Sequence, residues 1–305
     1  MDSPENGDLA STTYAESQHE PVWDHSPAPG ILRIMTSEID GFAEWHDTQV
    51  SLRDGQDAYF GLNVLRGLVS GLQTAASVRR TERSWGPGVL ASTMWMDDPE
   101  LIEVLGCMAN VCVVVTKQHR AKYERPETQP LRDLATSNGL AHDAYPELFD
   151  YATGESGEGL VVGPGTPNWR ESTKIHAVRE VGFRKSGQRL VPIVHAKIAL
   201  LGRMWWTDEH PSGHVVDQMS FEAERLWIGS ANFTRSSRRG LEMGMWTTDA
   251  QLMAGAREFL LNLVAISEPL GTGPDIPAPE LLPVSYDDVA MSEALRSEAA
   301  WEDDD

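Results

Sequence analysis

Two polar residues interrupt an apolar stretch of the chain in a pattern suited to binding and attacking a phosphate. His195 and Lys197 stand two positions apart within residues 191–200, where most other side chains are apolar. If this stretch is a strand, both side chains project from one face, because residues two apart in a strand point the same way. A cation beside an imidazole is unfavourable unless both share an anion, which a phosphate would supply. The pair therefore predicts half of a phosphate-handling active site, and a structural histidine is the alternative.

A second polar group follows further along the chain. An apolar strand candidate at 226–228 runs into Gly229, Ser230 and Asn232. Ser230 and Asn232 share a face if the extended geometry continues. A hydroxyl and a carboxamide can hydrogen-bond phosphate oxygens or orient an imidazole. The same residue types are favoured in turns, so a plain turn is the alternative, above all for Ser230.

Taken together, the pieces His195-x-Lys197 and Gly229-Ser230-x-Asn232 resemble the signature of the phospholipase D superfamily, in particular its nuclease-like and tyrosyl-DNA phosphodiesterase-like branches. Glu242 matches the acidic residue that often follows the second piece in that family. The resemblance covers about residues 88–266, and its specific motifs fall within 191–246. It implies an α/β fold with a mixed sheet flanked by helices and one half-site per chain.

The resemblance also implies a mechanism. In that family one histidine attacks phosphorus to form a phosphohistidine, and a second protonates the leaving oxygen and then activates water. The lysine and asparagine bind the non-bridging oxygens, so neither a metal nor another cofactor is implied. Because the chain contains His-x-Lys once, a homodimer would supply the second His195. Glu242 is expected to orient His195.

One position departs from the family pattern. The family places an aspartate five residues after the lysine, and Gly202 stands there in this chain. The tyrosyl-DNA phosphodiesterase branch also lacks this aspartate and uses an asparagine in the later motif. The departure therefore makes Asn232 the residue expected to compensate.

Charge distribution bears on the substrate. The net charge of −21 disfavours nucleic acid taken alone, because phosphates need positive charge at the contact surface. Residues 170–240, however, contain 12 Lys and Arg against 7 Asp and Glu. Within this segment, Arg235, Arg238 and Arg239 are candidate contacts to a nucleic-acid backbone, and a solvated turn is the alternative.

The elements that must position these residues form a mixed α/β pattern over residues 31–268. Two buried strands, at 88–95 and 111–116, flank a helix that Asp98 caps, which predicts a parallel strand–helix–strand unit. The remaining predicted elements are a core-facing helix within 57–79, a helix near 128–138, strands at 175–181, 191–201, 226–228 and 241–247, and a helix at 251–266 capped by Asp249.

Both ends of the chain differ from this pattern. Residues 1–30 are polar and residues 269–305 are acidic and Pro-rich, so we predict disorder in both. No apolar run is long enough to span a bilayer, and residues 1–5 are acidic, unlike a signal peptide. We therefore expect a cytoplasmic protein without a membrane partner.

These observations predict a metal-independent phosphodiesterase, namely a nuclease that cleaves DNA as a homodimer. One alternative is a catalytically silent nucleic-acid-binding subunit of a defence or repair complex. Another is a lipid phosphodiesterase of the phospholipase D type, for which no membrane-facing segment is visible. The pattern leaves open whether the substrate is single- or double-stranded, whether it is DNA or RNA, and whether cleavage is sequence-specific.

Overall fold

The computed structural model describes residues 35–39, 42–52, 56–78, 83–137, 139–153, 159–166, 168–182, 193–207, 218–271 and 279–302. All of them belong to Ile31–Asp305, the second of two compact units. The predicted disordered segment 1–30 lies outside the described residues, as do residues 208–217 between the two motifs.

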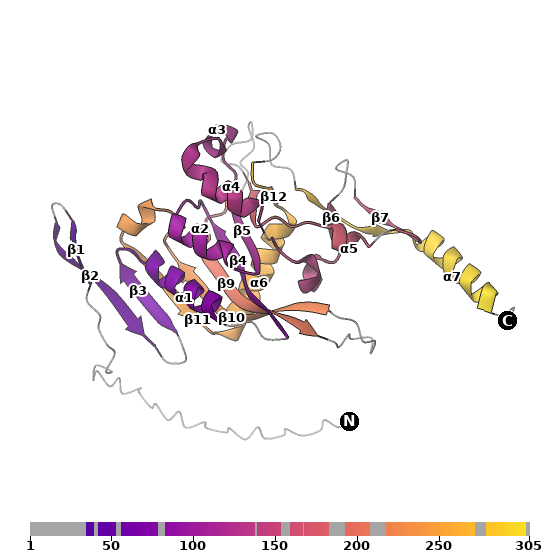
Figure 1. Cartoon of the computed structure of the whole chain (residues 1–305), viewed down its shortest axis with the longest axis horizontal. Helices are drawn as coiled ribbons and strands as arrows, with labels where there is room; N and C mark the ends of the chain where they lie inside the picture. The colour runs from indigo at the N-terminus through magenta and orange to yellow at the C-terminus, as the bar shows by residue number, and fades with distance from the viewer. Residues whose placement is uncertain are drawn as a thin grey trace, which may run out of the picture. The chain divides into compact units, whose positions relative to one another are not determined.

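Within the described residues, ten strands form one mixed sheet in the order β1-β2-β3-β11-β10-β9-β4-β5-β8-β12 (Figure 1). Strands β4, β5 and β8 run parallel, whereas β9, β10, β11 and β3 pair antiparallel. The strands are β1 (Met35–Ile39), β2 (Phe42–Ser51), β3 (Asp57–Gly61), β4 (Ser84–Thr93), β5 (Asn110–Thr116), β8 (Val178–Val181), β9 (Ile198–Thr207), β10 (Gln218–Gly229), β11 (Glu242–Thr247) and β12 (Glu268–Pro269). The predicted mixed α/β class is confirmed.

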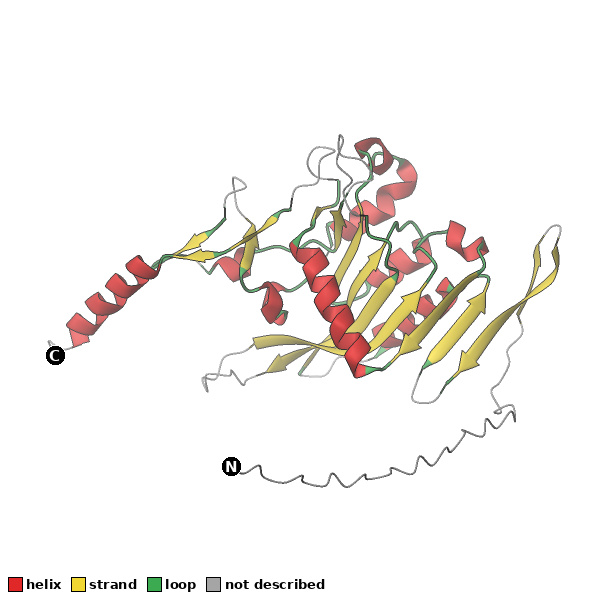
Figure 2. Ribbon diagram, turned by 180° about the vertical axis from the view of Figure 1, so that it is seen from behind, coloured by secondary structure: helices red, strands yellow, loops and turns green. Residues whose placement is uncertain are grey.

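Helices cover both faces of this sheet. Helices α1 and α2 lie over one face in Figure 1, and α6 lies over the other face in Figure 2. The helices are α1 (Leu65–Ser77), α2 (Pro99–Gly106), α3 (Arg120–Tyr123), α4 (Gln129–Ala135), α5 (Trp169–Ser172), α6 (Ala250–Ala265) and α7 (Asp288–Glu302). The sheet is therefore the central layer of the fold.

The two helical layers explain why the central strands are apolar throughout. Along β4, Val89 and Ala91 belong to the core that α1 and α2 cover, while Leu90 between them belongs to the core that α6 covers. Successive strand residues point to opposite faces, so a strand buried on both faces needs apolar residues at every position. Burial on both faces therefore accounts for the apolar runs from which β4 and β5 were predicted.

The predicted strand–helix–strand unit is confirmed as β4-α2-β5, with β4 and β5 parallel. Helix α2 begins after Asp98, whose carboxylate accepts a hydrogen bond from the backbone N–H of Leu101 at 3.0 Å. Helix α6 begins in the same way after Asp249, which accepts from Leu252 at 2.8 Å. Both predicted caps are confirmed.

The core-facing helix predicted within 57–79 is confirmed as α1, and the first residues of that range form a strand. Residues Asp57–Gly61 form β3, and α1 starts at Leu65. Asn63 between them has a φ of 56°, in the left-handed region that asparagine tolerates better than most residues. This turn separates the strand from the helix.

The spacing of Leu252, Ala256, Phe259, Leu260 and Leu263 predicts one apolar side for the helix at 251–266, and this prediction is only partly correct. Leu252 and Phe259 are 51% and 43% exposed, whereas Leu260, Leu261 and Val264 are buried against the sheet. The helix therefore packs against the sheet with a different face from the one that its apolar spacing predicts.

The end of the chain differs from its predicted disorder. Within 269–305, β13 (Leu281–Pro283) pairs with β6 (Tyr151–Thr153), and α7 follows. A further strand, β14 (Ser285–Tyr286), pairs with β7 (Val161–Val162). Burial of Leu281 and an ion pair of 2.8 Å between Arg179 and Glu280 stabilise this segment. The composition of this segment predicts neither the burial of Leu281 nor the ion pair with Arg179, because the partners lie far away in the sequence.

Candidate active site

The predicted site residues lie at one end of the central strands, where β4 and β10 end and β9 and β11 begin. Ile198, the first residue of β9, pairs with Ser92 on one side and Ile228 on the other. The backbone N–H of Gly229 donates to the carbonyl of Lys197 at 3.0 Å. Antiparallel pairing therefore joins the two sequence motifs directly.

His195 and Lys197 precede β9 and are not part of it. Hydroxyl groups hold this segment in place of strand pairing: Thr116 donates to the carbonyl of Val194 at 3.0 Å, and Ser92 donates to that of Ala196 at 3.5 Å. The prediction that a strand covers 191–197 is therefore wrong where residues are described, at 193–197. Residues 191 and 192 lie outside the described residues.

The two side chains nevertheless meet. The amine Nζ of Lys197 lies 3.0 Å from Nδ1 and 3.1 Å from Nε2 of His195. An ammonium group can only donate hydrogen bonds, so the contact favours the neutral imidazole. The neutral form is the one that carries a lone pair able to attack phosphorus.

The charge of Lys197 is not compensated by an ion pair. Its side chain is 6% exposed, and within the described part of the chain no carboxylate lies within 4.0 Å of its amine. Burial lowers the pKa of Lys197 from its ordinary value, and the negative charge of Glu242 partly opposes this shift. A buried cation without a paired anion is unfavourable, so this position is suited to binding an anionic ligand.

Ser230 and Glu242 form a second pair in the site. The hydroxyl of Ser230 donates to Oε2 of Glu242 at 2.5 Å and accepts from the backbone N–H of Met243 at 3.0 Å. These bonds fasten the end of β10 to the start of β11. Ser230 thereby orients the carboxylate whose charge acts on Lys197.

Asn232 lies in a turn that other elements hold in place. The backbone N–H of Phe233 donates to the hydroxyl of Thr93, and the carbonyl of Phe233 accepts from Asp97 and Asp98. Within the described residues, Oδ1 of Asn232 is buried and has no hydrogen-bond partner. A buried unpaired carboxamide is costly, and a bound ligand would satisfy it through either end of the amide.

The three arginines of the same turn have different surroundings. Arg238 donates to Oδ1 of Asp98 and to Glu100, both at 2.8 Å, and to Asn63 at 3.2 Å. Hydrogen bonding to Asp98 raises the pKa of Arg238. Arg238 therefore ties the turn to the start of α2, which leaves Arg235 and Arg239, both exposed, as the more accessible cations.

Gly202, at the position of the family's aspartate, lies inside β9. A Cβ atom there would come within 2.2 Å of the carbonyl of Glu222 and 2.6 Å of the ring of Phe221. Five residues of strand place it about 16 Å from Lys197. Phe221 occupies the space that a side chain would need, so the site is built without an aspartate at this position.

Sequence reasoning missed the hydroxyl groups that hold the site. Ser92, Thr93 and Thr116 are buried at the carboxyl ends of β4 and β5. The sequence could have indicated them, because in each of these strands an apolar run ends in polar residues.

Within the described residues there is no group of three or more His, Cys, Asp or Glu side chains that could hold a metal ion. No helix of the described chain has the length and apolarity needed to cross a membrane.

Comparisons with known proteins gave structural matches only. No protein-family model and no curated protein matches the sequence. Among solved structures, NucT from Helicobacter pylori aligns with a TM-score of 0.42 and 10% identity, over 70% of this chain and 98% of that chain. Nuc from Salmonella typhimurium, a phospholipase D family member, aligns with a TM-score of 0.37 and 12% identity, over 70% and 97%.

Proposed function

We propose that this chain is a metal-independent phosphodiesterase, specifically a nuclease that cleaves DNA through a phosphohistidine. The observation that carries the proposal is the contact of 3.0 Å between Lys197 and His195, in which a buried amine without an ion pair adjoins an exposed imidazole. A phosphodiester would supply the missing anion and present phosphorus to the ring.

In the first step a ring nitrogen of neutral His195 attacks phosphorus. A P–N bond forms and the P–O bond to the leaving strand breaks, while an acid protonates the leaving oxygen. Lys197 and Asn232 would bind the non-bridging oxygens and stabilise the charge that develops there. In the second step water attacks phosphorus, gives up a proton to the conjugate base of that acid, and releases His195.

A second copy of His195 would be the acid. The chain holds one His-x-Lys pair, so the complete site requires two copies of the chain. Beside the site, Leu241, Met243 and Phe60 are 58%, 43% and 45% exposed, and Met243 is the cross-strand partner of Phe60. Exposed apolar side chains grouped in this way are typical of an interaction surface, which supports assembly across this end of the strands.

The basic segment supports a polyanionic substrate. Residues 170–240 carry the excess of Lys and Arg, and the exposed Arg235 and Arg239 lie in the turn that contains Asn232. Phosphate contacts of this kind position nucleic acid without reading its sequence. DNA is therefore the substrate we propose to test first.

The test is cleavage of labelled DNA in the presence of a chelator, with the parent and His195→Ala proteins compared. We expect parent activity to resist the chelator and His195→Ala to lose at least about a thousandfold in kcat, as expected for removal of a nucleophile. Parent protein denatured with detergent at alkaline pH, where a P–N bond is stable, should carry labelled phosphate on His195. Binding of DNA without turnover, unchanged in His195→Ala, would instead indicate a silent binding subunit.

A further inference from the structure

A large pocket lies at the other end of the sheet from His195. It has a volume of about 1140 Å³, and its lining includes Trp85 from β4, Trp206 from β9 and Asn110 from β5. Nine residues of extended chain separate Lys197 from Trp206, which is about 30 Å. The pocket is therefore separate from the proposed catalytic site.

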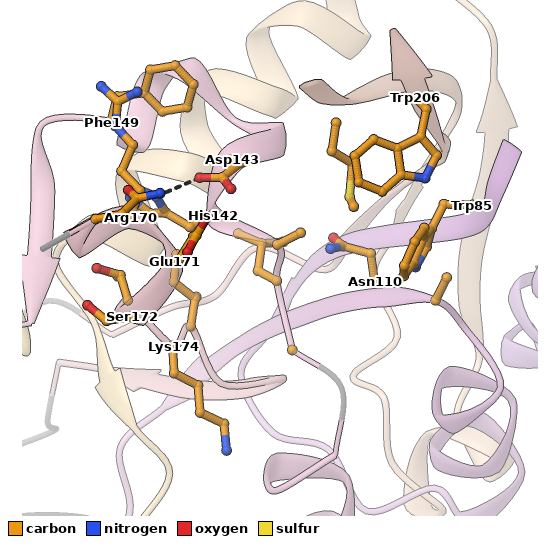
Figure 3. Close-up of a pocket in the computed structure, with 18 residues that line it drawn as sticks. Trp85, Asn110, His142, Asp143, Phe149, Arg170, Glu171, Ser172, Lys174 and Trp206 are labelled. Atoms are coloured by element: carbon orange, nitrogen blue, oxygen red, sulfur yellow. Dashed lines mark ion pairs between the residues drawn. The ribbon is translucent and has the colours of Figure 1, made fainter. Parts of the chain in front are cut away.

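One side of the pocket is an aromatic surface. Trp85 and Trp206 pack edge to face with ring centroids 5.4 Å apart, and Trp85 is 43% exposed. Figure 3 shows both rings beside Asn110. The Oδ1 atom of Asn110 accepts from Tyr145 at 3.0 Å, which leaves its amide hydrogens to be donated elsewhere. A planar ring with polar edges would find both a stacking partner and a donor here.

The opposite side contains two buried acceptor atoms that have no hydrogen-bond partner in the described chain, Nδ1 of His142 and Oδ1 of Asp143, which lie 3.7 Å apart (Figure 3). Nε2 of His142 contacts the carbonyls of Leu148 and Tyr151 at 2.8 and 3.2 Å, so this nitrogen carries the hydrogen. His142 is 4% exposed, and within the described residues neither its Nδ1 nor Oδ1 of Asp143 has a hydrogen-bond partner. These atoms are suited to accept from ring N–H and amino groups of a ligand.

Two cations and the exposed carboxylate of Glu171 complete the lining. Arg170 lies over the ring of Phe149, with its Cζ 4.2 Å from the centroid, and Lys174 is exposed. Within the described part of the chain neither has a carboxylate in ion-pair distance. Because neither cation is in an ion pair with the carboxylates of Asp143 or Glu171 in the described residues, both remain available to contact a phosphate.

We infer that this pocket is a second binding site for single-stranded nucleic acid. Bases would stack on Trp85 and Trp206 and present amino groups to His142 and Asp143, while Lys174 would contact phosphates. Stacking platforms combined with cations are the general means of binding single strands. The volume exceeds the range of about 300–1,000 Å³ typical of small-molecule pockets, which suits a segment of several nucleotides better than one small ligand.

The inference is tested by binding, which requires no turnover. A fluorescent single-stranded oligonucleotide of adenine and cytosine, about 20 nucleotides long, is titrated by anisotropy against full-length protein in a His195→Ala background. We expect Trp85→Ala/Trp206→Ala to weaken binding about tenfold or more, since each stacked base contributes substantially. Lys174→Glu should cause a smaller loss that disappears at high salt.

The matched control is Tyr286→Ala, which removes an aromatic side chain that is 48% exposed outside the pocket. Its affinity should equal that of the His195→Ala background. Equal affinity of the double tryptophan variant, an equal loss in the control, or no binding of the oligonucleotide overturns the inference. If the double variant does not fold, Trp85→Ala alone replaces it. The proposed function is judged separately, by cleavage in protein that retains His195.

Discussion

Two buried lysines of this chain have opposite surroundings. Lys117 and Lys197 are 4% and 6% exposed, and each lies at an end of a central strand. The amine of Lys117 lies 2.5 Å from Glu268 and 3.7 Å from Glu180. The amine of Lys197 contacts the ring nitrogens of His195 and no carboxylate among the described residues. One lysine therefore has its counter-charges within the fold, and the other does not.

The geometry of the sheet explains the first case. Glu268 on β12 is the cross-strand partner of Glu180 on β8, and two carboxylates opposite each other repel. Lys117 follows β5, the other neighbour of β8, and its backbone N–H donates to Val181 at 3.2 Å. Its amine thus reaches both carboxylates. The hydroxyl of Tyr123 donates to Glu180 and completes the group.

The difference indicates how a structural charge can be distinguished from a functional one. Thr116, next to Lys117, holds the carbonyl of Val194, next to His195. The residue next to the paired Lys117 thus holds the segment that carries His195 and the unpaired Lys197. A compensated cluster stabilises the fold, whereas an uncompensated cation remains available to a ligand.

The largest effect that this comparison predicts is on stability. We expect Lys117→Met to lower the free energy of unfolding by about 3–5 kcal/mol, because it leaves two carboxylates buried without their cation. Urea denaturation measures the change. Lys197→Met is the matched control and should cost less than about 1 kcal/mol, since it removes a buried charge that has no ion pair. Equal costs would show that the two lysines do not differ in this way.

The second effect is on catalysis. We expect Lys197→Met to lower kcat for a small chromogenic phosphodiester by about 10²–10³, the typical loss when one group that stabilises transition-state charge is removed. In the parent, activity should fall on the alkaline side before pH 10.5, because burial lowers the pKa of Lys197 from that value. A variant with full activity and an unchanged pH profile would remove Lys197 from the proposed mechanism.

Much of the fold could be predicted because burial leaves a direct mark on sequence. Residues 87–91 of β4 and 111–115 of β5 include no polar side chain, because helices cover both faces. Asp98 and Asp249 are capping residues by type. The long hairpin of β9 and β10 was not predicted in full. Thr207 pairs with Gln218 in a polar part of the hairpin, and nothing in the local pattern shows that these segments meet.

The active site could also be predicted only in part. Residue types and their order identified His195, Lys197, Ser230 and Asn232, yet their partners come from distant parts of the chain. Arg238 and Asp98 stand 140 positions apart, so neither residue showed that the other would bind it. The Lys117 cluster was not predicted for the same reason, because Glu268 lies 151 positions away.

The smallest effect concerns the pH dependence of the Lys117 cluster. Burial raises the pKa of Glu180 from 4.5 to about 7, although Tyr123 and Lys117 act in the opposite direction. Between these values the folded chain holds a proton that the unfolded chain has lost. Stability from this group is therefore fully present below about pH 4.5 and is lost as pH rises through about 7.

Glu180→Gln should reduce this dependence, because glutamine stays uncharged at every pH. We expect the decrease in Tm from pH 5 to pH 8 to be smaller in the variant than in the parent by roughly 2–4 °C, which corresponds to about 1 kcal/mol for a domain of this size. Glu147→Gln is the control. Burial alone would raise the pKa of Glu147, but the hydrogen bonds and positive charge of Arg257, together with a backbone hydrogen bond, lower it below 4.5, so this group stays ionised in both states across the same range. Parallel Tm curves for parent and Glu180→Gln would show that the Lys117 cluster keeps Glu180 ionised, and the contrast between the two lysines would then rest on charge pairing alone.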